Sequence, residues 1–378
     1  MSLAAREVLI REQQRALTGE LVGEIGRLAK KAGGHLRFME VCGTHTVAIF
    51  RAGLRQMLPP GLELVSGPGC PVCVTPDSYM DKAIAYAKRE DTIITTFGDM
   101  LKVPGSRSSL GAARTEGADI RIVYSPLDSL QVARDNPDKK VIFLAVGFET
   151  TAPTAAATVL AGKQAALGNL YMLSAQKLVP PVMRALISDP EVKVDGFILP
   201  GHVAVVTGTE AFRFLETDCH LPGVVTGFEP LQILRSLYRL TAQAAAGEAR
   251  VENEYGSVVR PEGNPKSRQV TEEVYEAVGV EWRGLGEIPA SGLRMREAYA
   301  EFDIERVLPL KAEELPPPKK TACRCGEVLR GVVTPRDCPL FGTACVPTHA
   351  VGPCMVSVEG VCAAWHKYGK GTFSYGIK

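Results

Sequence analysis

The sequence predicts an α/β protein with two Rossmann-like α/β lobes, each built on a parallel sheet, and a small cysteine-rich domain. Short apolar runs alternate with helical stretches from residue 36 to about residue 246, and this pattern then stops. Six of the ten cysteines lie between Cys323 and Cys362. Alternating strands and helices are typical of parallel sheets that helices cover on both faces. The 378 residues are enough for two or three domains.

Apolar spacing along the chain predicts the individual elements. The chain opens with an expected amphipathic helix, Ala4–Lys31, which stops at two glycines. Strands are expected at residues 36–41, 62–65, 92–97, 120–124, 141–146, 171–174, 196–199 and 224–226. Helices are expected at residues 46–58, 77–88, 151–167, 180–187, 209–216 and 230–246. Thr75 is expected to cap the helix 77–88, with Pro76 in its first turn.

These elements predict four parts of the chain. Residues 1–34 form an N-terminal helix that we expect to pack on the carboxyl-terminal domain. Residues 35–138 form the first α/β domain and residues 139–248 the second, meeting near residues 136–140. Residues 249–378 form the cysteine-rich domain, because polar residues and a run of three prolines break the α/β pattern there.

Composition limits the possible functions. The net charge is +1, from 43 basic and 42 acidic residues, so no nucleic-acid footprint is indicated. No signal peptide opens the chain and no apolar run reaches about 18 residues, so we expect a cytoplasmic protein without a membrane span. Disulfides are disfavoured in that compartment, and the ten cysteines therefore indicate metal binding or redox chemistry.

The first cysteine motif is Cys42-Gly43-Thr44-His45, which follows the strand 36–41 and begins a helix. Ligands of open α/β sheets bind beyond the carboxyl ends of strands. The dipole at a helix N-terminus lowers a thiol pKa, which makes the thiolate a better ligand or nucleophile. His45 is close enough to orient the thiol. The alternative is that Cys42 packs as a small apolar residue and His45 only caps a helix.

The second motif is Gly67-Pro68-Gly69-Cys70-Pro71-Val72-Cys73, which again lies between a strand and a helix. Two thiols at this spacing can share a metal or close a reversible disulfide. The pair is typical of a thioredoxin-like redox site, of half a zinc site or of a site for another soft metal, and an inert buried pair is the alternative. Because the two motifs follow neighbouring strands, we expect Cys42, Cys70 and Cys73 to converge in one crevice.

The carboxyl-terminal cysteines are Cys323, Cys325, Cys338, Cys345, Cys354 and Cys362, at irregular intervals. Zinc ribbons usually contain two pairs at C-x-x-C spacing, and this block contains none. Iron–sulfur clusters need four thiolates that are often spread along the chain, which would leave two thiols for a redox dithiol. The pattern favours an iron–sulfur cluster over zinc, and it does not fix which four cysteines are the ligands.

Taken together, these motifs resemble the HypD family of hydrogenase maturation factors. The resemblance is carried by five segments in family order: CGTHT at 42–46, GPGCPVC at 67–73, GFETT at 147–151, PGHV at 200–203, and FGTAC at 341–345 with GPCMVSVEGVC at 352–362. It implies a third domain with a [4Fe–4S] cluster, held by Cys323, Cys338, Cys345 and Cys362. Cys325 and Cys354 would form an extra redox pair, as in ferredoxin-thioredoxin reductase.

The resemblance also implies partners and a reaction. Fe(II) carrying cyanide and carbonyl ligands would be bound between Cys42 and a thiolate of a small HypC-type chaperone, with Cys70 and Cys73 as the adjacent redox or ligand pair. A HypE-type donor would supply cyanide from a thiocyanate on its last cysteine. We expect a monomer that forms such hetero-complexes. Many relatives carry a second histidine where this sequence has Val47, so His45 is the nearby imidazole here.

Two further residues are candidates for proton delivery or partner contact, Glu149 and His202, both at strand ends. The alternatives are that Glu149 caps the following helix and that His202 is a satisfied loop histidine. The rival functions are an iron–sulfur-dependent thiol-disulfide oxidoreductase acting through Cys70 and Cys73, and a zinc-stabilised interaction scaffold. The first rival leaves the Cys42 motif unexplained, and metal analysis would identify the second.

Overall fold

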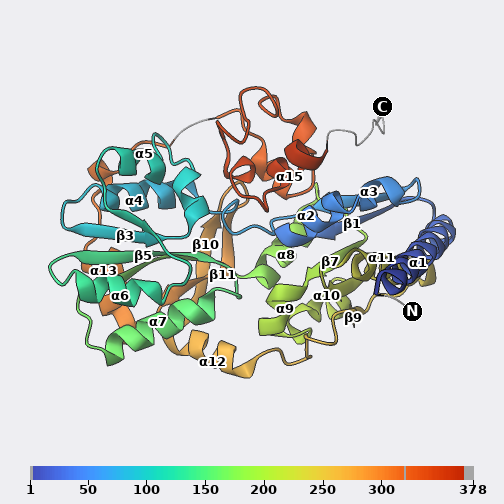
Figure 1. Cartoon of the computed structure of the whole chain (residues 1–378), viewed down its shortest axis with the longest axis horizontal. Helices are drawn as coiled ribbons and strands as arrows, with labels where there is room; N and C mark the ends of the chain where they lie inside the picture. The colour runs from blue at the N-terminus through green and yellow to red at the C-terminus, as the bar shows by residue number, and fades with distance from the viewer. Residues whose placement is uncertain (1–2, 319–320, 370–378) are drawn as a thin grey trace. The chain divides into compact units, whose positions relative to one another are not determined.

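The computed structural model describes residues 3–318 and 321–369, with side chains of the first helix from Gln14 onward. The chain divides into two compact units (Figure 1). Unit 1 contains the chain up to Gly69, then Ile187–Gly263, and the chain from Ala364 onward. Unit 2 contains Cys70–Leu186 and Asn264–Ala363.

Unit 1 is built on a five-stranded parallel sheet in the order β2-β1-β7-β8-β9. Its strands are β1 (Leu36–Glu40), β2 (Leu62–Ser66), β7 (Gly196–Pro200), β8 (Gly223–Thr226) and β9 (Val251–Asn253). Its helices are α1 (Leu3–Lys31), α2 (Gly43–Arg51), α3 (Leu54–Met57), α9 (Gly201–Thr207), η2 (Glu210–Phe212), α10 (Phe214–Thr217) and α11 (Pro230–Ala246).

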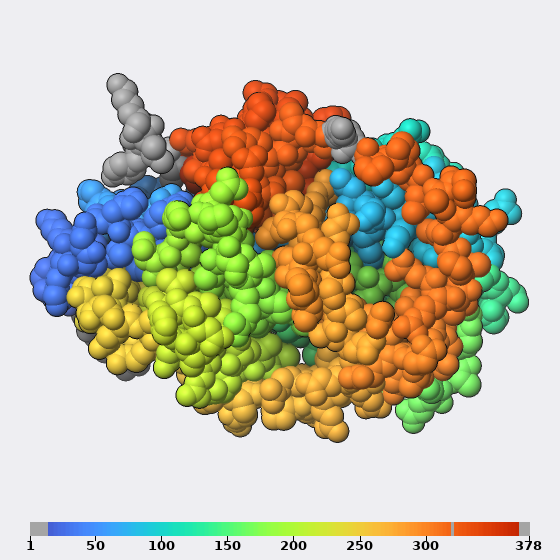
Figure 2. All heavy atoms as spheres, turned by 180° about the vertical axis from the view of Figure 1, so that it is seen from behind, coloured from blue at the N-terminus to red at the C-terminus, as the bar shows by residue number. Residues whose placement is uncertain are grey.

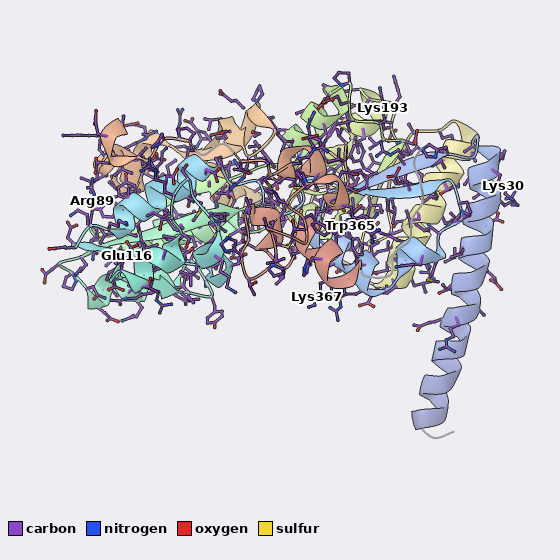
Figure 3. All side chains as sticks on the ribbon, turned by 90° about the horizontal axis from the view of Figure 1, so that it is seen from above. Lys30, Arg89, Glu116, Lys193, Trp365 and Lys367 are labelled. Atoms are coloured by element: carbon purple, nitrogen blue, oxygen red, sulfur yellow. The ribbon has the colours of Figure 1, made fainter. Side chains whose placement is uncertain are left out.

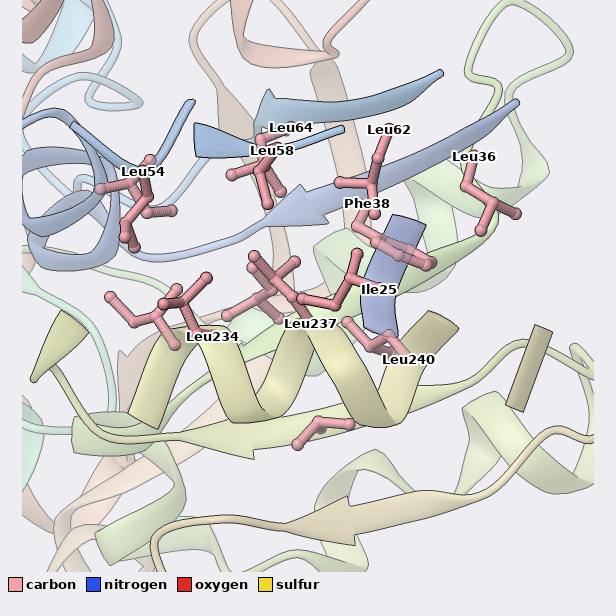
Figure 4. Packing of buried hydrophobic residues seen from close by; sticks show 14 of the residues in the cluster. Ile25, Leu36, Phe38, Leu54, Leu58, Leu62, Leu64, Leu234, Leu237 and Leu240 are labelled. Atoms are coloured by element: carbon pink, nitrogen blue, oxygen red, sulfur yellow. The ribbon is translucent and has the colours of Figure 1, made fainter. Parts of the chain in front are cut away.

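The core of unit 1 lies between the sheet and α11. Leu234, Leu237 and Leu240 of α11 face Phe38 and Leu64 of the sheet (Figure 4). Ile25 and residues near it on α1 pack on α11. The expected packing of this helix on the cysteine-rich domain stays a prediction. Figure 3 shows α1 as the long helix that carries the label Lys30.

Unit 2 is built on a four-stranded parallel sheet in the order β4-β3-β5-β6, with a separate antiparallel hairpin β10-β11. The strands are β3 (Thr92–Thr96), β4 (Ile120–Ile122), β5 (Lys140–Gly147), β6 (Leu170–Gln176), β10 (Tyr275–Trp282) and β11 (Gly286–Met295). The α-helices are α4 (Asp77–Ala87), α5 (Leu110–Thr115), α6 (Asp128–Asp135), α7 (Ala152–Gln164), α12 (Pro265–Val274), α13 (Ile304–Val307) and α14 (Cys325–Leu329). The 3-10 helices are η1 (Gly98–Lys102), η3 (Glu297–Phe302), η4 (Ala312–Glu314), η5 (Pro335–Asp337) and η6 (Pro353–Met355).

Two helices continue across the boundary between the units. They are α8 (Val179–Ser188) and α15 (Val361–Tyr368). In Figure 2, the orange residues that include the hairpin and α13 cover much of the visible face of unit 2. Among the described residues, no helix combines the length and the apolar character that crossing a membrane requires.

The α/β class and the parallel sheets confirm the sequence prediction. The division of the strands between the two sheets differs from the one that the expected ranges imply. β1 pairs with β7, so the strands of residues 36–66 complete a sheet with those of residues 196–253. The strands between 92 and 176 form the other sheet. Buried parallel strands have similar apolar sequences, and nothing local distinguishes their partners.

Three local features also differ from expectation. The helix expected at 46–58 breaks into α2 and α3 at Gly53, whose φ of 66° favours glycine. The helix expected at 209–216 is η2 followed by the short α10. The β10-β11 hairpin was missed because its residues alternate between buried and exposed, which lowers its overall apolar character.

Candidate functional site

The loops after β1 and β2 touch each other in unit 1. The two strands are paired in parallel, with Glu40 opposite Ser66, so both loops leave the same edge of the sheet. The Gly67 N–H donates to the Glu40 carbonyl at 2.8 Å, and the Gly43 N–H donates to the Gly69 carbonyl at 3.0 Å. This confirms that the two cysteine motifs follow neighbouring strands.

Cys42 lies at the N-cap of α2, in extended conformation, and is buried. Gly69 packs directly on it: a Cβ on Gly69 would lie 2.2 Å from the Cys42 nitrogen. Gly69 is therefore required for the close approach of the two loops, and Cys70 is the next residue in the chain. The convergence of the Cys42, Cys70 and Cys73 thiols stays a prediction.

Gly69→Ala is expected to lower the free energy of unfolding by about 1–3 kcal/mol, because the added methyl group forces two backbone segments apart. Chemical denaturation of the reduced protein measures this change. The matched control is Gly168→Ala, since a Cβ there meets nothing within 4 Å. Equal stability of the two variants would contradict the packing described for Gly69.

His45 lies in the first turn of α2 and is fully buried. Its Nε2 lies 2.9 Å from the Gly227 carbonyl, which only accepts, so we assign the proton to Nε2. Burial lowers the pKa of His45 to about 4, which keeps the ring neutral near pH 7. Nδ1 is a buried acceptor without a hydrogen-bond partner among the described residues. His45 is thus held as a neutral imidazole whose Nδ1 can accept a hydrogen bond.

The two predicted histidines meet through an aromatic ring that the sequence analysis missed. Phe228, after β8, stacks on His45 with ring centroids 4.7 Å apart and on His202 at 3.9 Å. His202 lies in the first turn of α9, so it is not a loop histidine. The repeat of Gly-Phe-Glu at 147–149 and 227–229 is the one signal in the sequence that points to Phe228.

In unit 2, Cys70 and Cys73 occupy a tight turn before α4. The Cys73 N–H donates to the Cys70 sulfur at 3.3 Å, and both side chains are buried. The predicted Thr75 cap is wrong: the Thr75 hydroxyl donates to the Pro71 carbonyl at 2.9 Å, and Pro76 is the N-cap of α4. Thr75 thus stabilises the cysteine turn rather than the helix.

All six carboxyl-terminal cysteines line one cavity in unit 2. Four other residues complete its wall, and the full lining is Cys323, Cys325, Val328, Cys338, Phe341, Cys345, Gly352, Cys354, Met355 and Cys362. The Val351 N–H donates to the Cys345 sulfur at 3.3 Å. None of the ten cysteines forms a disulfide. Among the described residues, no three His, Cys, Asp or Glu side chains form a group that could hold a metal ion.

One thiol of the cavity is polarised by its neighbours. A hydrogen bond from Cys323 and the charge of Arg283 lower the pKa of Cys325 to about 6, against the opposing effect of burial. Arg283 itself forms an ion pair with Asp77 at 2.6 Å. Nothing in the sequence points to Arg283, because it comes from the β10-β11 turn and meets Cys325 only in the folded chain.

The cavity adjoins the Cys70-Cys73 turn. The Cys73 thiol donates to the carbonyl of Pro353, the residue before Cys354, at 4.0 Å, and the Cys354 side chain is near enough to raise the pKa of Cys73. Burial, and then the contacts with Cys354 and Cys70, raise the pKa of Cys73 well above its usual value. A row of thiols therefore leads from the cavity through Cys354 to Cys73 and Cys70, all within unit 2.

Glu149 follows β5 in unit 2 and is 7% exposed. Its Oε1 accepts from the Val179 N–H at 2.8 Å, at the start of α8. Its Oε2 is buried without a hydrogen-bond partner among the described residues. Burial raises the pKa of Glu149 to about 7. Glu149 thus stabilises the start of α8 rather than α7, and it can hold or release a proton near neutral pH.

Glu149→Gln is expected to flatten the pH dependence of stability. In the wild type the folded pKa of Glu149 is about 7, against an ordinary 4.5. Stability from this group is complete below about pH 4.5 and is lost as the pH rises through 7, because the folded state binds the proton more tightly. Glutamine keeps the acceptor for Val179 but cannot ionise.

Between pH 5 and pH 8 the free energy of unfolding should fall by about 2–3 kcal/mol less in the variant than in the wild type. Denaturant unfolding of the reduced protein at both pH values measures it. Glu287→Gln is the control, since that carboxylate is exposed. If the free energy of unfolding of Glu149→Gln falls with pH as steeply as that of the wild type, Glu149 is not the group responsible.

Two parallel sheets, with cysteine motifs at strand ends and a cavity lined by six cysteines, define a cysteine-rich α/β protein. A family model described as "HypD: Hydrogenase formation hypA family" matches residues 16–369. The chain belongs to the HypD family of hydrogenase maturation factors.

Individual relatives agree with this assignment. The chain is 44% identical over 362 residues to "Hydrogenase maturation factor HypD" of Escherichia coli (strain K12), covering 94% of this chain and 95% of that protein. It is 46% identical over 341 residues to the factor of the same name from Azotobacter vinelandii, covering 88% and 89%. With the factor of Rhodobacter capsulatus the identity is 44% over 361 residues, covering 94% and 96%.

Proposed function

We propose that this protein is the scaffold on which the iron–cyanide–carbonyl part of a [NiFe]-hydrogenase is assembled. Fe(II) is the cargo, held by the Cys42 thiolate and a thiolate of a small HypC-type chaperone, and cyanide comes from a HypE-type donor. One observation carries the proposal: Cys42 packs on Gly69, the residue before the Cys70-Cys73 pair. A soft thiolate and a neighbouring dithiol suit a low-spin iron that gains strong-field ligands.

His45 suits this role because it is neutral and its Nδ1 can accept a hydrogen bond. A neutral imidazole three residues from Cys42 can orient the thiol without adding a positive charge beside the iron. His202, stacked on the same Phe228 ring, supports the orientation of His45. Glu149, with a pKa of about 7, is a proton donor for partner chemistry in unit 2.

We further propose that the cavity in unit 2 holds a [4Fe–4S] cluster. Six thiols and a few apolar side chains line one cavity, and thiolates are the usual ligands of such clusters, which supports the proposal. No three of the described thiols are arranged around a single metal ion, and a cluster spreads its four thiolates over several irons. Cys323, Cys338, Cys345 and Cys362 would be the ligands, and Cys325 and Cys354 the redox pair. When bound, the cluster would supply electrons one at a time.

The row of thiols supports a role in cyanide release. A thiocyanate, R–S–CN, gives R–SH and HCN when two thiols supply two electrons and two protons and close a disulfide. We assign this step to Cys70 and Cys73, whose hydrogen-bonded turn supports their action as a pair. Cys354 can then attack the Cys73 sulfur, which releases the Cys70 thiol and forms a Cys354–Cys73 disulfide. Attack of Cys325 on Cys354 releases the Cys73 thiol and leaves a Cys325–Cys354 disulfide, whose reduction needs two electrons.

Infrared spectroscopy of the anaerobically purified complex with a HypC-type chaperone tests the proposal. We expect cyanide and carbonyl stretches from metal-bound ligands, in a region that proteins leave empty. Absence of these bands in a complex that retains iron would overturn it. Iron and labile sulfide should also be found without stoichiometric zinc, which separates this function from a zinc-stabilised scaffold.

The row of thiols also favours a second candidate, an iron–sulfur-dependent thiol-disulfide oxidoreductase. This function needs Cys354, Cys73 and Cys70 but has no use for Cys42. Reduction of a protein disulfide by the protein alone, undiminished when Cys42 is replaced, would favour this candidate over metal assembly.

A further inference from the structure

We propose that Arg55 and Trp365 position the loops that carry Cys42 and Cys70. We propose also that this positioning depends on whether the cysteine cavity holds a cluster. The group formed by Phe50, Arg55 and Trp365 is called the aromatic clamp below. The inference rests on the proposed roles of Cys42 as the iron ligand and of Cys362 as a cluster ligand.

Arg55, on α3, sits at the centre of the clamp. Its side chain is 15% exposed. The guanidinium carbon lies 4.8 Å from the centre of the Phe50 ring and 5.7 Å from that of Trp365. The two rings meet edge to face at 5.4 Å. A planar guanidinium between aromatic rings is held in one orientation, which a lysine ammonium would not be.

That orientation directs Arg55 toward the ends of the two strands that lead into the cysteine motifs. One terminal nitrogen donates to the Leu64 carbonyl of β2 at 2.5 Å. The other lies 3.4 Å from Glu40 Oε1 and 3.4 Å from the Ser66 hydroxyl. The Ser66 hydroxyl donates to the same Glu40 oxygen.

These bonds tie together the last residues of β1 and β2. Glu40 is fully buried and stands two residues before Cys42, and Ser66 begins the loop to Cys70. A buried carboxylate without its cation is costly, so removing Arg55 disturbs the strand ends rather than the distant core. Arg55 is therefore a positioning residue for both cysteine motifs.

Trp365 links the clamp to the cysteine cavity. It lies on α15 and is labelled in Figure 3. Cys362, which lines the cavity, precedes it by one helical turn. A bond from Cys362 to a cluster would restrict the amino-terminal end of α15, and with it the Trp365 ring. Loading of the cavity would then stabilise Arg55, Glu40 and Ser66 in the arrangement described.

The test is the rate at which iodoacetamide labels Cys42, measured by mass spectrometry on the reduced, full-length protein. The rate is compared between cluster-loaded protein and protein from which iron has been removed anaerobically with bipyridyl and dithionite. We expect removal of the cluster to change the rate about tenfold in the wild type, within the usual range of coupling between sites.

The variants separate positioning from general stability. Arg55→Lys keeps a charge for Glu40 but loses the planar stacking, and Trp365→Ala removes the ring. In both we expect the rate to become independent of cluster state, while cluster absorbance is retained. Trp365→Phe should restore the dependence, and Arg51→Met, which alters an exposed arginine on α2, should leave it unchanged.

A wild-type rate that is indifferent to the cluster overturns the inference, as does an unchanged dependence in Arg55→Lys and Trp365→Ala. Circular dichroism of each variant confirms that it is folded. This test is independent of the infrared bands of the partner complex. A protein can therefore fail the infrared test while its Cys42 still responds to the cluster, and the reverse also holds.

Discussion

Replacing Cys42 by alanine is expected to abolish the infrared bands of metal-bound cyanide and carbonyl while the absorbance of the iron–sulfur cluster remains. Cys42 is the cysteine at the end of β1, and it is not among the residues that line the cysteine cavity. The cargo iron would lose its only ligand from this protein, whereas the cluster would keep all four. The expected loss is complete rather than partial.

The comparison needs anaerobic complexes prepared in the same way, with iron and labile sulfide measured beside the infrared spectrum. Cys219→Ala is the matched control, because Cys219 is half-buried, lies outside every motif and lines no part of the cavity. Its bands should equal those of the wild type. Bands that survive in Cys42→Ala would assign the iron to another residue.

Replacing Cys354 by alanine is expected to disconnect the cluster from the Cys70-Cys73 pair. Cys354 lines the cavity and contacts the Cys73 thiol, so it is the sulfur through which exchange passes. Thiol-disulfide exchange needs a thiolate that attacks a disulfide sulfur directly, and no such step remains after the substitution. The cluster should still form, because its four proposed ligands are intact.

The measurement is the redox state of Cys70 and Cys73 after dithionite is added to oxidised protein, followed by alkylation and mass spectrometry. In the wild type the pair should be reduced, and in Cys354→Ala the rate should fall by about two orders of magnitude or more, as for the loss of a reacting thiol. Met355→Leu, a similar-sized change in the same cavity wall, should behave as the wild type. Equal reduction in all three proteins would show that electrons take another route.

The sequence was sufficient to predict the features that depend on local pattern. Apolar runs gave nearly every strand of the two sheets, and the order of strand, loop and helix placed Cys42 and Cys70 after neighbouring strands. The six carboxyl-terminal cysteines could be grouped because they crowd a short stretch of chain. Their shared cavity agrees with that grouping.

What the sequence could not reveal depends on contacts between distant segments. The pairing of β1 with β7 brings Phe228 to His45, and neither residue carries a local signal of the other. Arg55 and Arg283 look like ordinary surface arginines until the fold buries one beside Glu40 and places the other beside Cys325. Long-range parallel pairing leaves no local trace, so such partners must be found in the folded chain.

The sheet of unit 1 takes its strands from two stretches of the chain, which has a consequence for synthesis on the ribosome. In the sheet of unit 1, β1 lies between β2 and β7, yet β2 ends at Ser66 and β7 begins only at Gly196. While the intervening chain is made, one edge of β1 is without its neighbour, and an unpaired strand edge promotes aggregation. The sheet of β3 to β6 is complete in that interval, so a nascent chain would mature from its middle outward. The cysteines of the cavity follow the last strand of both sheets, so they leave the ribosome after the chain of both sheets has been made.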